Sequence, residues 1–290
     1  MKLLNQILRG VVIGVANIIP GVSGGTMMVS MGIYDKLIHC VTHLFKEFKQ
    51  SVKFIFPYAL GMVIAIATLS FALKWAFAEY PLPTNTLFIG LILGGLPAIL
   101  KQVKGEKTGA LGAVLFVIFF AIVVLLQIFQ KENSAVIQLS VLEVIKLFLL
   151  GCIASATMVI PGVSGSMILK LLGYYEPIVT EALPAAITAL TGGDFPALLN
   201  SVGILLPFGV GIVVGIFAIA KLIEVLMARW KGLTYMAIIG MVAASPVAIL
   251  LGTDMAGFSW GILAVSVVTF AVGYVIAWKL GDEPETLPGK

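Results

Sequence analysis

The chain has 290 residues, of which 60% are hydrophobic and 11% are charged, and its net charge is +4. A typical soluble domain carries about 25% charged residues, so this composition excludes a soluble globular protein and is typical of a protein with several membrane spans. The small positive charge gathers in a few loops, which indicates membrane topology rather than nucleic-acid binding.

Eight apolar segments predict the helices in chain order. The first and the fifth each contain a Pro-Gly-Val-Ser-Gly sequence inside an apolar run, and each is followed by three uninterrupted runs that are long enough to cross a hydrocarbon core about 30 Å thick. The segments are 7–34, 54–78, 84–100, 108–130, 142–175, 203–226, 233–251 and 258–279. No small-x-small cleavage site follows the first basic and apolar stretch, so we expect this stretch to belong to the mature protein.

The two halves align with each other beyond the repeated motif. Gly10 matches Gly151 at an offset of 141 positions, and Gly61 matches Gly211 at an offset of 150 positions later in the chain. This alignment predicts one duplicated unit without a second domain. The predicted boundaries are 1–290 for a single membrane domain, 1–132 for the first repeat and 140–282 for the second repeat.

Positive charge predicts the orientation of the chain, because basic loops stay in the cytoplasm. The loops 36–53, 101–107 and 227–232 carry lysine or arginine, whereas Lys131 is the one basic residue in the loops between them. The number of membrane crossings places all the basic loops in the cytoplasm only if each motif segment enters and leaves the membrane on the same side. The sequence then predicts an all-α polytopic membrane protein with cytoplasmic N- and C-termini. It would be an inverted repeat, in which each half has one re-entrant helical hairpin and three transmembrane helices.

An alternative topology makes each motif segment one kinked full span. It gives eight crossings and two parallel repeats. It requires the charge rule to fail, because the lysines of 36–53 and 101–107 would then lie on opposite sides of the membrane.

Two further segments are expected at the membrane surface. Residues 35–50 place apolar side chains at helical spacing, which predicts an amphipathic helix on the inner surface. Residues 177–200 are a candidate counterpart on the outer surface, interrupted by two prolines and two glycines.

The repeated break has the chemistry of an anion site. Proline ends a helix because it lacks an N–H donor, glycine permits tight turns and close approach, and the next helix begins with unpaired N–H groups at the positive end of its dipole. The candidate substrate-binding residues are Asn17, Pro20, Gly21, Ser23, Gly24, Gly25 and Thr26 in the first break, Pro161, Gly162, Ser164, Gly165 and Ser166 in the second break, and Lys170 after it.

Irregular backbone persists in a membrane only where it is buried in protein or lines a cavity. The two breaks are therefore expected to meet near the midplane, related by a pseudo-two-fold axis. The alternative is that their glycines serve only close packing between helices.

Few charged residues lie in or beside the apolar segments. Lys170 either neutralises a bound anion or reaches to the interface. Asp35 and Glu176 are matched carboxylates that follow the two breaks, and they are either proton-coupling groups or ordinary interfacial residues. Asn17 has Met158 at the matching position, so it could tune an otherwise symmetric site.

Other chemistries find little support in the chain. His39, Cys40 and His43 have metal-ligand spacing but no evident fourth ligand, so neither a metal site nor a cofactor is expected. No Ser-His-Asp arrangement can be placed on one membrane face, and no Walker loop is present. We therefore expect a transporter rather than an enzyme.

The chain resembles the PopT-type polyprenyl-phosphate transporters, a family of bacterial and archaeal membrane proteins. The resemblance lies in the paired Ile-Pro-Gly-Val-Ser-Gly motifs, together with Phe56-Pro57-Tyr58-x-x-Gly61 and Leu206-Pro207-Phe208-x-x-Gly211. It covers nearly the whole chain. It implies translocation of undecaprenyl phosphate, the lipid carrier of cell-wall precursors, across the cytoplasmic membrane, with the headgroup held at the breaks 20–26 and 161–167.

Two other function classes stay open. A transporter of a small water-soluble anion would use the same helix ends without an opening to lipid, and a lipid-phosphate phosphatase would release inorganic phosphate. The expected partners are the polyprenyl-phosphate lipid and membrane lipids, without nucleic acid. The sequence leaves open the exact lipid, the coupling ion, the direction of net transport, the dominant conformation and the oligomeric state.

Overall fold

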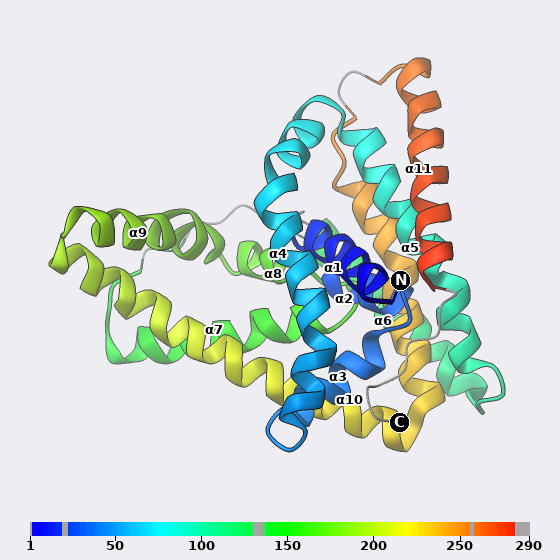
Figure 1. The fold of residues 1–290 in the computed structure, drawn as a ribbon, viewed down its shortest axis with the longest axis horizontal. Helices are drawn as coiled ribbons and strands as arrows, with labels where there is room; N and C mark the ends of the chain where they lie inside the picture. The colour runs from blue at the N-terminus through cyan, green and yellow to red at the C-terminus, as the bar shows by residue number, and fades with distance from the viewer. Residues whose placement is uncertain (1, 19–22, 130–134, 136, 256–257, 282–290) are drawn as a thin grey trace. The chain divides into compact units, whose positions relative to one another are not determined.

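The computed structural model describes residues 2–18, 23–129, 135, 137–255 and 258–281, and every regular element in this part of the chain is a helix (Figure 1). The elements are α1 (Lys2–Ile18), α2 (Gly24–Ser30), α3 (Tyr34–Thr42), α4 (Phe48–Glu79), α5 (Pro81–Val103), α6 (Gly109–Ile128), α7 (Val141–Val159), α8 (Gly165–Leu171), the π-helix η1 (Glu176–Ala182), α9 (Leu183–Gly192), α10 (Phe195–Leu251) and α11 (Trp260–Gly281).

Four of the described helices, α5, α6, α10 and α11, are long and apolar enough to cross a membrane. One crossing needs about 20 residues. With 57 residues, α10 spans both segments predicted at 203–226 and 233–251, and its backbone leaves the helical conformation at Trp230 (φ −138°, ψ 52°). The 32 residues of α4 cover the segment predicted at 54–78. The prediction of an all-helical membrane protein is thus confirmed for the described residues, while the inversion of the repeats and the re-entrant paths stay predictions.

The chain divides into two compact units. The first comprises Met1–Ile128, Ile160–Val163 and Ala220–Lys290, and the second comprises Phe129–Val159 and Ser164–Ile219. These units differ from the two predicted repeats, because α11 belongs to the first unit and packs along α5 (Figure 1).

Glycines allow α5 and α11 to approach closely. A Cβ atom on Gly90 would lie 2.1 Å from the backbone oxygen of Phe270, and one on Gly273 would lie 2.1 Å from that of Leu87. Small residues with this role are typical of helix interfaces in membranes, where close packing replaces the hydrophobic driving force.

In the first unit, α1 crosses α4 through two glycines. A Cβ atom on Gly10 would lie 2.3 Å from the carbonyl oxygen of Tyr58, and one on Gly61 would lie 2.1 Å from that of Ile7. Each helix therefore presents a glycine to the backbone of the other, and the crossing excludes any side chain at these two positions.

The second unit contains the same crossing between α7 and the first part of α10. Gly151 faces the carbonyl of Phe208 and Gly211 faces that of Phe148, at 2.1 and 2.0 Å from the corresponding Cβ positions. All four of these residues match those of the first unit at the offsets of 141 and 150 positions. The duplication in the sequence is therefore also a duplication of helix packing.

The amphipathic helix expected at 35–50 is shorter than predicted. It ends as α3 at Thr42, and α4 begins at Phe48. The Thr42 hydroxyl bonds the carbonyl oxygen of His39 and contacts a ring nitrogen of His43, and such local bonds compete with helix continuation.

Residues 177–200 are more regular than the sequence suggested. Pro196 lies in the first turn of α10, where a missing N–H donor is tolerated. Pro184 lies where η1 continues into α9 with helical backbone at Ala182 and Leu183, so neither proline ends a helix. The interruption is at Gly193, which follows α9 with a φ of +72°.

Candidate functional site

The second break is a tight turn that only glycine can make. α7 ends at Val159 and α8 begins at Gly165. Between them Gly162 has a φ of +84°, in the left-handed region that side chains rarely adopt. A Cβ atom there would also lie 2.7 Å from the backbone oxygen of Met241 on α10. The motif glycine is thus required both by the backbone conformation and by the close approach of α10.

The first break is described from Ser23 onward, and Pro20 and Gly21 lie outside the described residues. Ser23 precedes α2 with φ −101° and ψ 126°, and Ser164 precedes α8 with φ −95° and ψ 133°. The two motif serines therefore have nearly the same extended backbone conformation. Neither hydroxyl caps its own helix, so the first N–H groups of both short helices are left without the cap that serine commonly provides.

The two breaks contact each other within the first unit. The N–H of Gly162 donates a buried hydrogen bond of 2.7 Å to Oγ1 of Thr26, and the Ser23 hydroxyl donates a longer one of 3.4 Å to the carbonyl of Ile160. The meeting of the two breaks is therefore confirmed for these residues. Thr26 joins the breaks by accepting this bond with its side-chain oxygen, and the donation of its hydroxyl to an anion stays a prediction because a hydroxyl can accept and donate at once.

Asn17 lies beside the first break. A Cβ atom on Gly24 would be 2.4 Å from Oδ1 of Asn17, so the absence of a side chain at Gly24 lets the amide approach the first turn of α2. Gly25 and Thr26 are buried directly after it. Five candidate residues, Asn17, Ser23, Gly24, Gly25 and Thr26, thus gather around one helix start.

The remaining candidates follow the second break into the second unit. The hydroxyls of Ser164 and Ser166 lie 2.8 Å apart across the buried Gly165. Lys170 lies in the last turn of α8, about 9 Å along the helix from Ser164 at 1.5 Å per residue. Its ammonium is 5.4 Å from the ring centroid of Tyr175, a cation–π distance. In this conformation Lys170 therefore interacts with an aromatic ring at the opposite end of the helix.

The two matched carboxylates have different surroundings. Tyr235 on α10 donates a hydrogen bond from its hydroxyl to Asp35 at the start of α3. Although part of its surface is open, protein crowding around the carboxyl raises the pKa of Asp35, against the lowering effects of the Tyr235 hydrogen bond and of Lys231. Glu176 is exposed, as Asp35 is, and lies at the start of η1.

A small cavity of about 20 Å³ lies next to Asp35 and is also lined by Tyr34, Gln102 and Tyr235. A space of this size holds about one water molecule. The Tyr34 hydroxyl is buried without a hydrogen-bond partner among the described residues, so this cavity combines a carboxyl group of raised pKa with polar groups around room for one water molecule.

Two pairs of oppositely charged residues three positions apart form ion pairs. Lys146 lies 3.2 Å from the carboxylate of Glu143, which also accepts a hydrogen bond from Tyr174, and Lys221 pairs with Glu224. A buried arginine was not expected. Arg9 is fully buried on α1 and donates a hydrogen bond to the carbonyl of Leu280 at the end of α11. Its position inside the first apolar segment was the one signal that could have indicated this burial.

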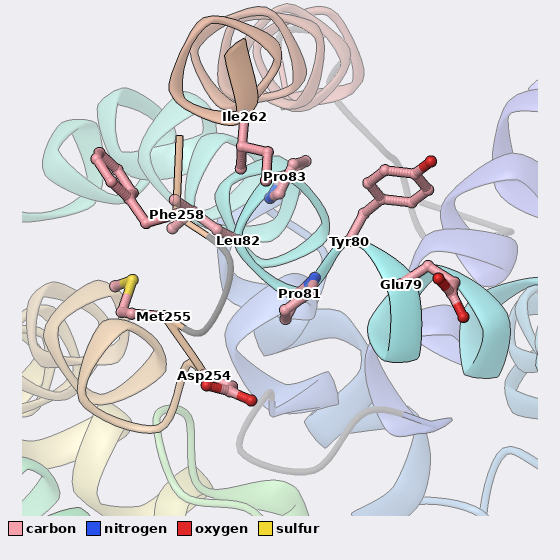
Figure 2. Close-up of a pocket in the computed structure, with 9 residues that line it drawn as sticks. All are labelled: Glu79, Tyr80, Pro81, Leu82, Pro83, Asp254, Met255, Phe258 and Ile262. Carbon is pink, nitrogen blue, oxygen red and sulfur yellow. The ribbon is translucent and has the colours of Figure 1, made fainter. Parts of the chain in front are cut away.

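A pocket of about 100 Å³ lies where α4 meets α5 and the start of α11 (Figure 2). Figure 2 shows Pro81 and Pro83 of α5 in the middle of its lining, with Glu79 and Asp254 near them. Its lining contains these two acids and no lysine or arginine. This charge disfavours an anionic headgroup, so the pocket is not a second candidate for the phosphate.

Comparisons with known proteins match the chain to transporters of polyprenyl phosphates. A family model described as undecaprenyl phosphate translocase-like matches residues 13–260, which include both breaks. A polyprenyl-phosphate transporter of Staphylococcus aureus (strain NCTC 8325 / PS 47) is 31% identical over 282 residues, covering 95% of this chain and 95% of the relative. A polyprenyl-phosphate transporter of Vibrio cholerae serotype O1 is 28% identical over 256 residues, covering 83% of this chain and 75% of the relative. No solved structure matches the chain.

Proposed function

Because the chain belongs to the undecaprenyl phosphate translocase-like family, we propose that it moves undecaprenyl phosphate across the cytoplasmic membrane and returns this lipid carrier to the cytoplasmic leaflet. The substrate joins a charged phosphate to a long apolar chain. Burying the charge in hydrocarbon without compensating polar groups is too costly for unaided crossing, so the protein's task is to carry the headgroup while the tail stays in lipid.

The observation that carries this proposal is the hydrogen bond between Thr26 and Gly162, because it brings two polar breaks of apolar segments together. We assign the headgroup to the uncapped N–H groups at the starts of α2 and α8, helped by the hydroxyls of Ser23, Ser164 and Ser166. The twin backbone conformations of Ser23 and Ser164 support two equivalent contributions to one site.

The proposed transport cycle uses the duplication. Two inverted repeats, each with one re-entrant hairpin and three spans, would expose the headgroup site to each leaflet in turn, with both termini in the cytoplasm. The basic loops 36–53, 101–107 and 227–232 support this orientation, and the repeated glycine crossing supports two equivalent halves.

The test is leaflet translocation of undecaprenyl phosphate in proteoliposomes, comparing the wild type with a Ser23→Ala plus Ser164→Ala double variant. We expect fast movement in the wild type and movement slowed at least about 10-fold in the variant, since hydrogen bonds to charged groups each contribute about 1.5–3 kcal/mol. Equal rates would remove the hydroxyls from the mechanism. Wild-type protein that is folded but no faster than empty liposomes would favour transport of a small water-soluble anion.

A matched control replaces two other buried serines, Ser155 and Ser266, by alanine. Their hydroxyls donate to carbonyls of their own helices, three and four residues earlier, at 2.9 and 2.8 Å. This pair carries the same chemical change in the same numbers, so a loss confined to the Ser23 and Ser164 variant assigns the effect to the breaks.

We also propose that Asp35 couples transport to a proton. Because its pKa is raised, Asp35 holds a proton at higher pH than an ordinary carboxyl does. Translocation is then expected to slow as the pH rises through this raised pKa, and Asp35→Asn should flatten the profile because an amide does not titrate.

Glu176→Gln is the control for this pH experiment, since Glu176 matches Asp35 in the sequence and is likewise exposed, while the hydrogen bond from Tyr235 and the raised pKa belong to Asp35. It should leave the pH profile unchanged. A wild-type rate that is independent of pH and insensitive to collapse of the proton gradient would overturn the role of Asp35 without touching the assignment of the headgroup site.

A further inference from the structure

We propose that His39, His43 and Glu224 form a binding site for one transition-metal ion of the Zn²⁺ type. The site lies in the first unit, where α3 packs beside α10. Its residues lie outside the two breaks in the sequence. The proposal stands independently of the transported substrate.

The distances between the ligand atoms fit one tetrahedral ion. Oε1 of Glu224 lies 3.3 Å from Nδ1 of His43 and 3.7 Å from Nδ1 of His39, and all three ligand atoms lie within 4.8 Å of one another. Zinc binds imidazole nitrogen and carboxylate oxygen at about 2.0–2.2 Å, which places neighbouring tetrahedral ligands about 3.3–3.6 Å apart. To bring all three atoms to bonding distance, the two stacked imidazoles have to rotate, because a ring nitrogen binds a metal in the plane of its ring.

The helix orients both imidazoles toward the same carboxylate. His39 lies in the last turn of α3, and His43 is the residue that follows the helix, four positions later. Their rings stack with centroids 4.2 Å apart. The side chains of His39, His43 and Glu224 are 29%, 25% and 22% exposed, so an ion can reach them from solvent.

The groups around the three ligand atoms also resemble those around known metal sites. Nε2 of His39 lies 3.6 Å from the carboxylate of Glu47, and a metal-binding histidine commonly directs its other nitrogen to a carboxylate. Lys221 bonds Oε2 of Glu224, which leaves Oε1 turned toward the histidines. An ion would displace the contacts of His43 Nδ1 with Thr42 and with the carbonyl of His39. Three protein ligands leave a fourth position for water.

The sequence alone had offered Cys40 beside the two histidines and no further ligand. In the structure Cys40 is buried on α3, and the third member of the cluster comes from α10. The expectation of no metal site rested on that missing ligand, which only the packing of two distant helices supplies.

The experiment measures Co²⁺ and Zn²⁺ binding to the purified full-length chain in detergent, after removal of any polyhistidine tag. Tetrahedral Co²⁺ reports on the site through its visible absorption, and Zn²⁺ is added as a competitor. We expect one ion per chain, a loss of affinity of at least about 10-fold for Glu224→Gln, and no specific binding for His39→Ala plus His43→Ala. The chain has only these two histidines, so the double variant removes every imidazole.

Two control variants test whether the metal binds at this site rather than at other ligand atoms of the chain. Cys40→Ser plus Cys152→Ser removes both cysteines and should leave binding intact, while Lys221→Gln frees Glu224 from its ion pair and should strengthen binding. Wild-type protein without saturable binding at micromolar Zn²⁺, specific binding that survives in the double histidine variant, or wild-type affinity in Glu224→Gln would overturn the proposal. Size-exclusion profiles show whether each variant is folded, and Glu224→Gln serves if the double variant is not.

Discussion

Gly162→Ala is expected to abolish translocation and to lower the stability of the protein more than any other single change at the breaks. The alanine would have to adopt a φ near +84°, and its Cβ would meet the backbone oxygen of Met241 at 2.7 Å. The backbone strain costs about 1–2 kcal/mol and the overpacking about 1–3 kcal/mol more. Relief of either one would move the N–H that bonds Thr26, so the contact between the breaks would be lost with it.

Gly193→Ala separates these two causes. Gly193 has a similar φ of +72°, but a Cβ atom there would meet nothing within 4 Å. This variant should lose only the strain energy of about 1–2 kcal/mol and keep its translocation rate. Thermal unfolding in detergent and translocation in proteoliposomes provide the two readouts. If both glycine variants lost the same stability and both transported lipid, the close approach of α10 to the second break would contribute to neither stability nor transport.

The second large effect is expected at the duplicated helix crossing. Gly211→Ala would place a Cβ 2.0 Å from the carbonyl oxygen of Phe148, so α7 and α10 would have to separate. Overpacking of this kind costs about 1–3 kcal/mol or more. Gly61→Ala should cost a similar amount in the first unit, where the same crossing faces Ile7 at 2.1 Å.

A control for this prediction lies two residues away in the same helix. A Cβ on Gly209 would meet nothing within 4 Å, and glycine inside a helix is about 0.5–1 kcal/mol less stable than alanine. Gly209→Ala should therefore be neutral or slightly stabilising in the same unfolding assay. A midpoint that falls equally for Gly209→Ala and Gly211→Ala would show that the crossing tolerates a methyl group.

Periodicity and repetition predicted the helices because apolar length and internal alignment are local properties of a sequence. The segments at 84–100 and 108–130 became α5 and α6 within a few residues of the expected bounds. The helix expected at 35–50 was too long because its apolar spacing gave no signal for the side-chain bonds of Thr42 that accompany its end.

The site could be predicted only in part. The motif glycines and serines predicted two breaks and a contact between them, and that contact is present at Thr26 and Gly162. The pairing of these two groups was not predictable, because only the three-dimensional packing brings the Gly162 N–H, which can only donate, to the Thr26 oxygen. Asp35 with Tyr235, and the histidines with Glu224, depend on α3 packing against α10, and no spacing within one segment reports such a pair.

The hydrogen bond from Arg9 to the carbonyl of Leu280 can form only after nearly the whole chain has been synthesised. Its two ends are separated by 271 positions, and at about 5–20 residues per second a ribosome needs roughly 14–54 s to make that length of chain. During this interval α1 is already in place with a cationic side chain that is fully buried in the finished protein. Until α11 is made, this guanidinium lacks its hydrogen bond to the carbonyl of Leu280. The last helix therefore completes the environment of the first, and a chain truncated before it would leave a charge exposed at the start of the membrane domain.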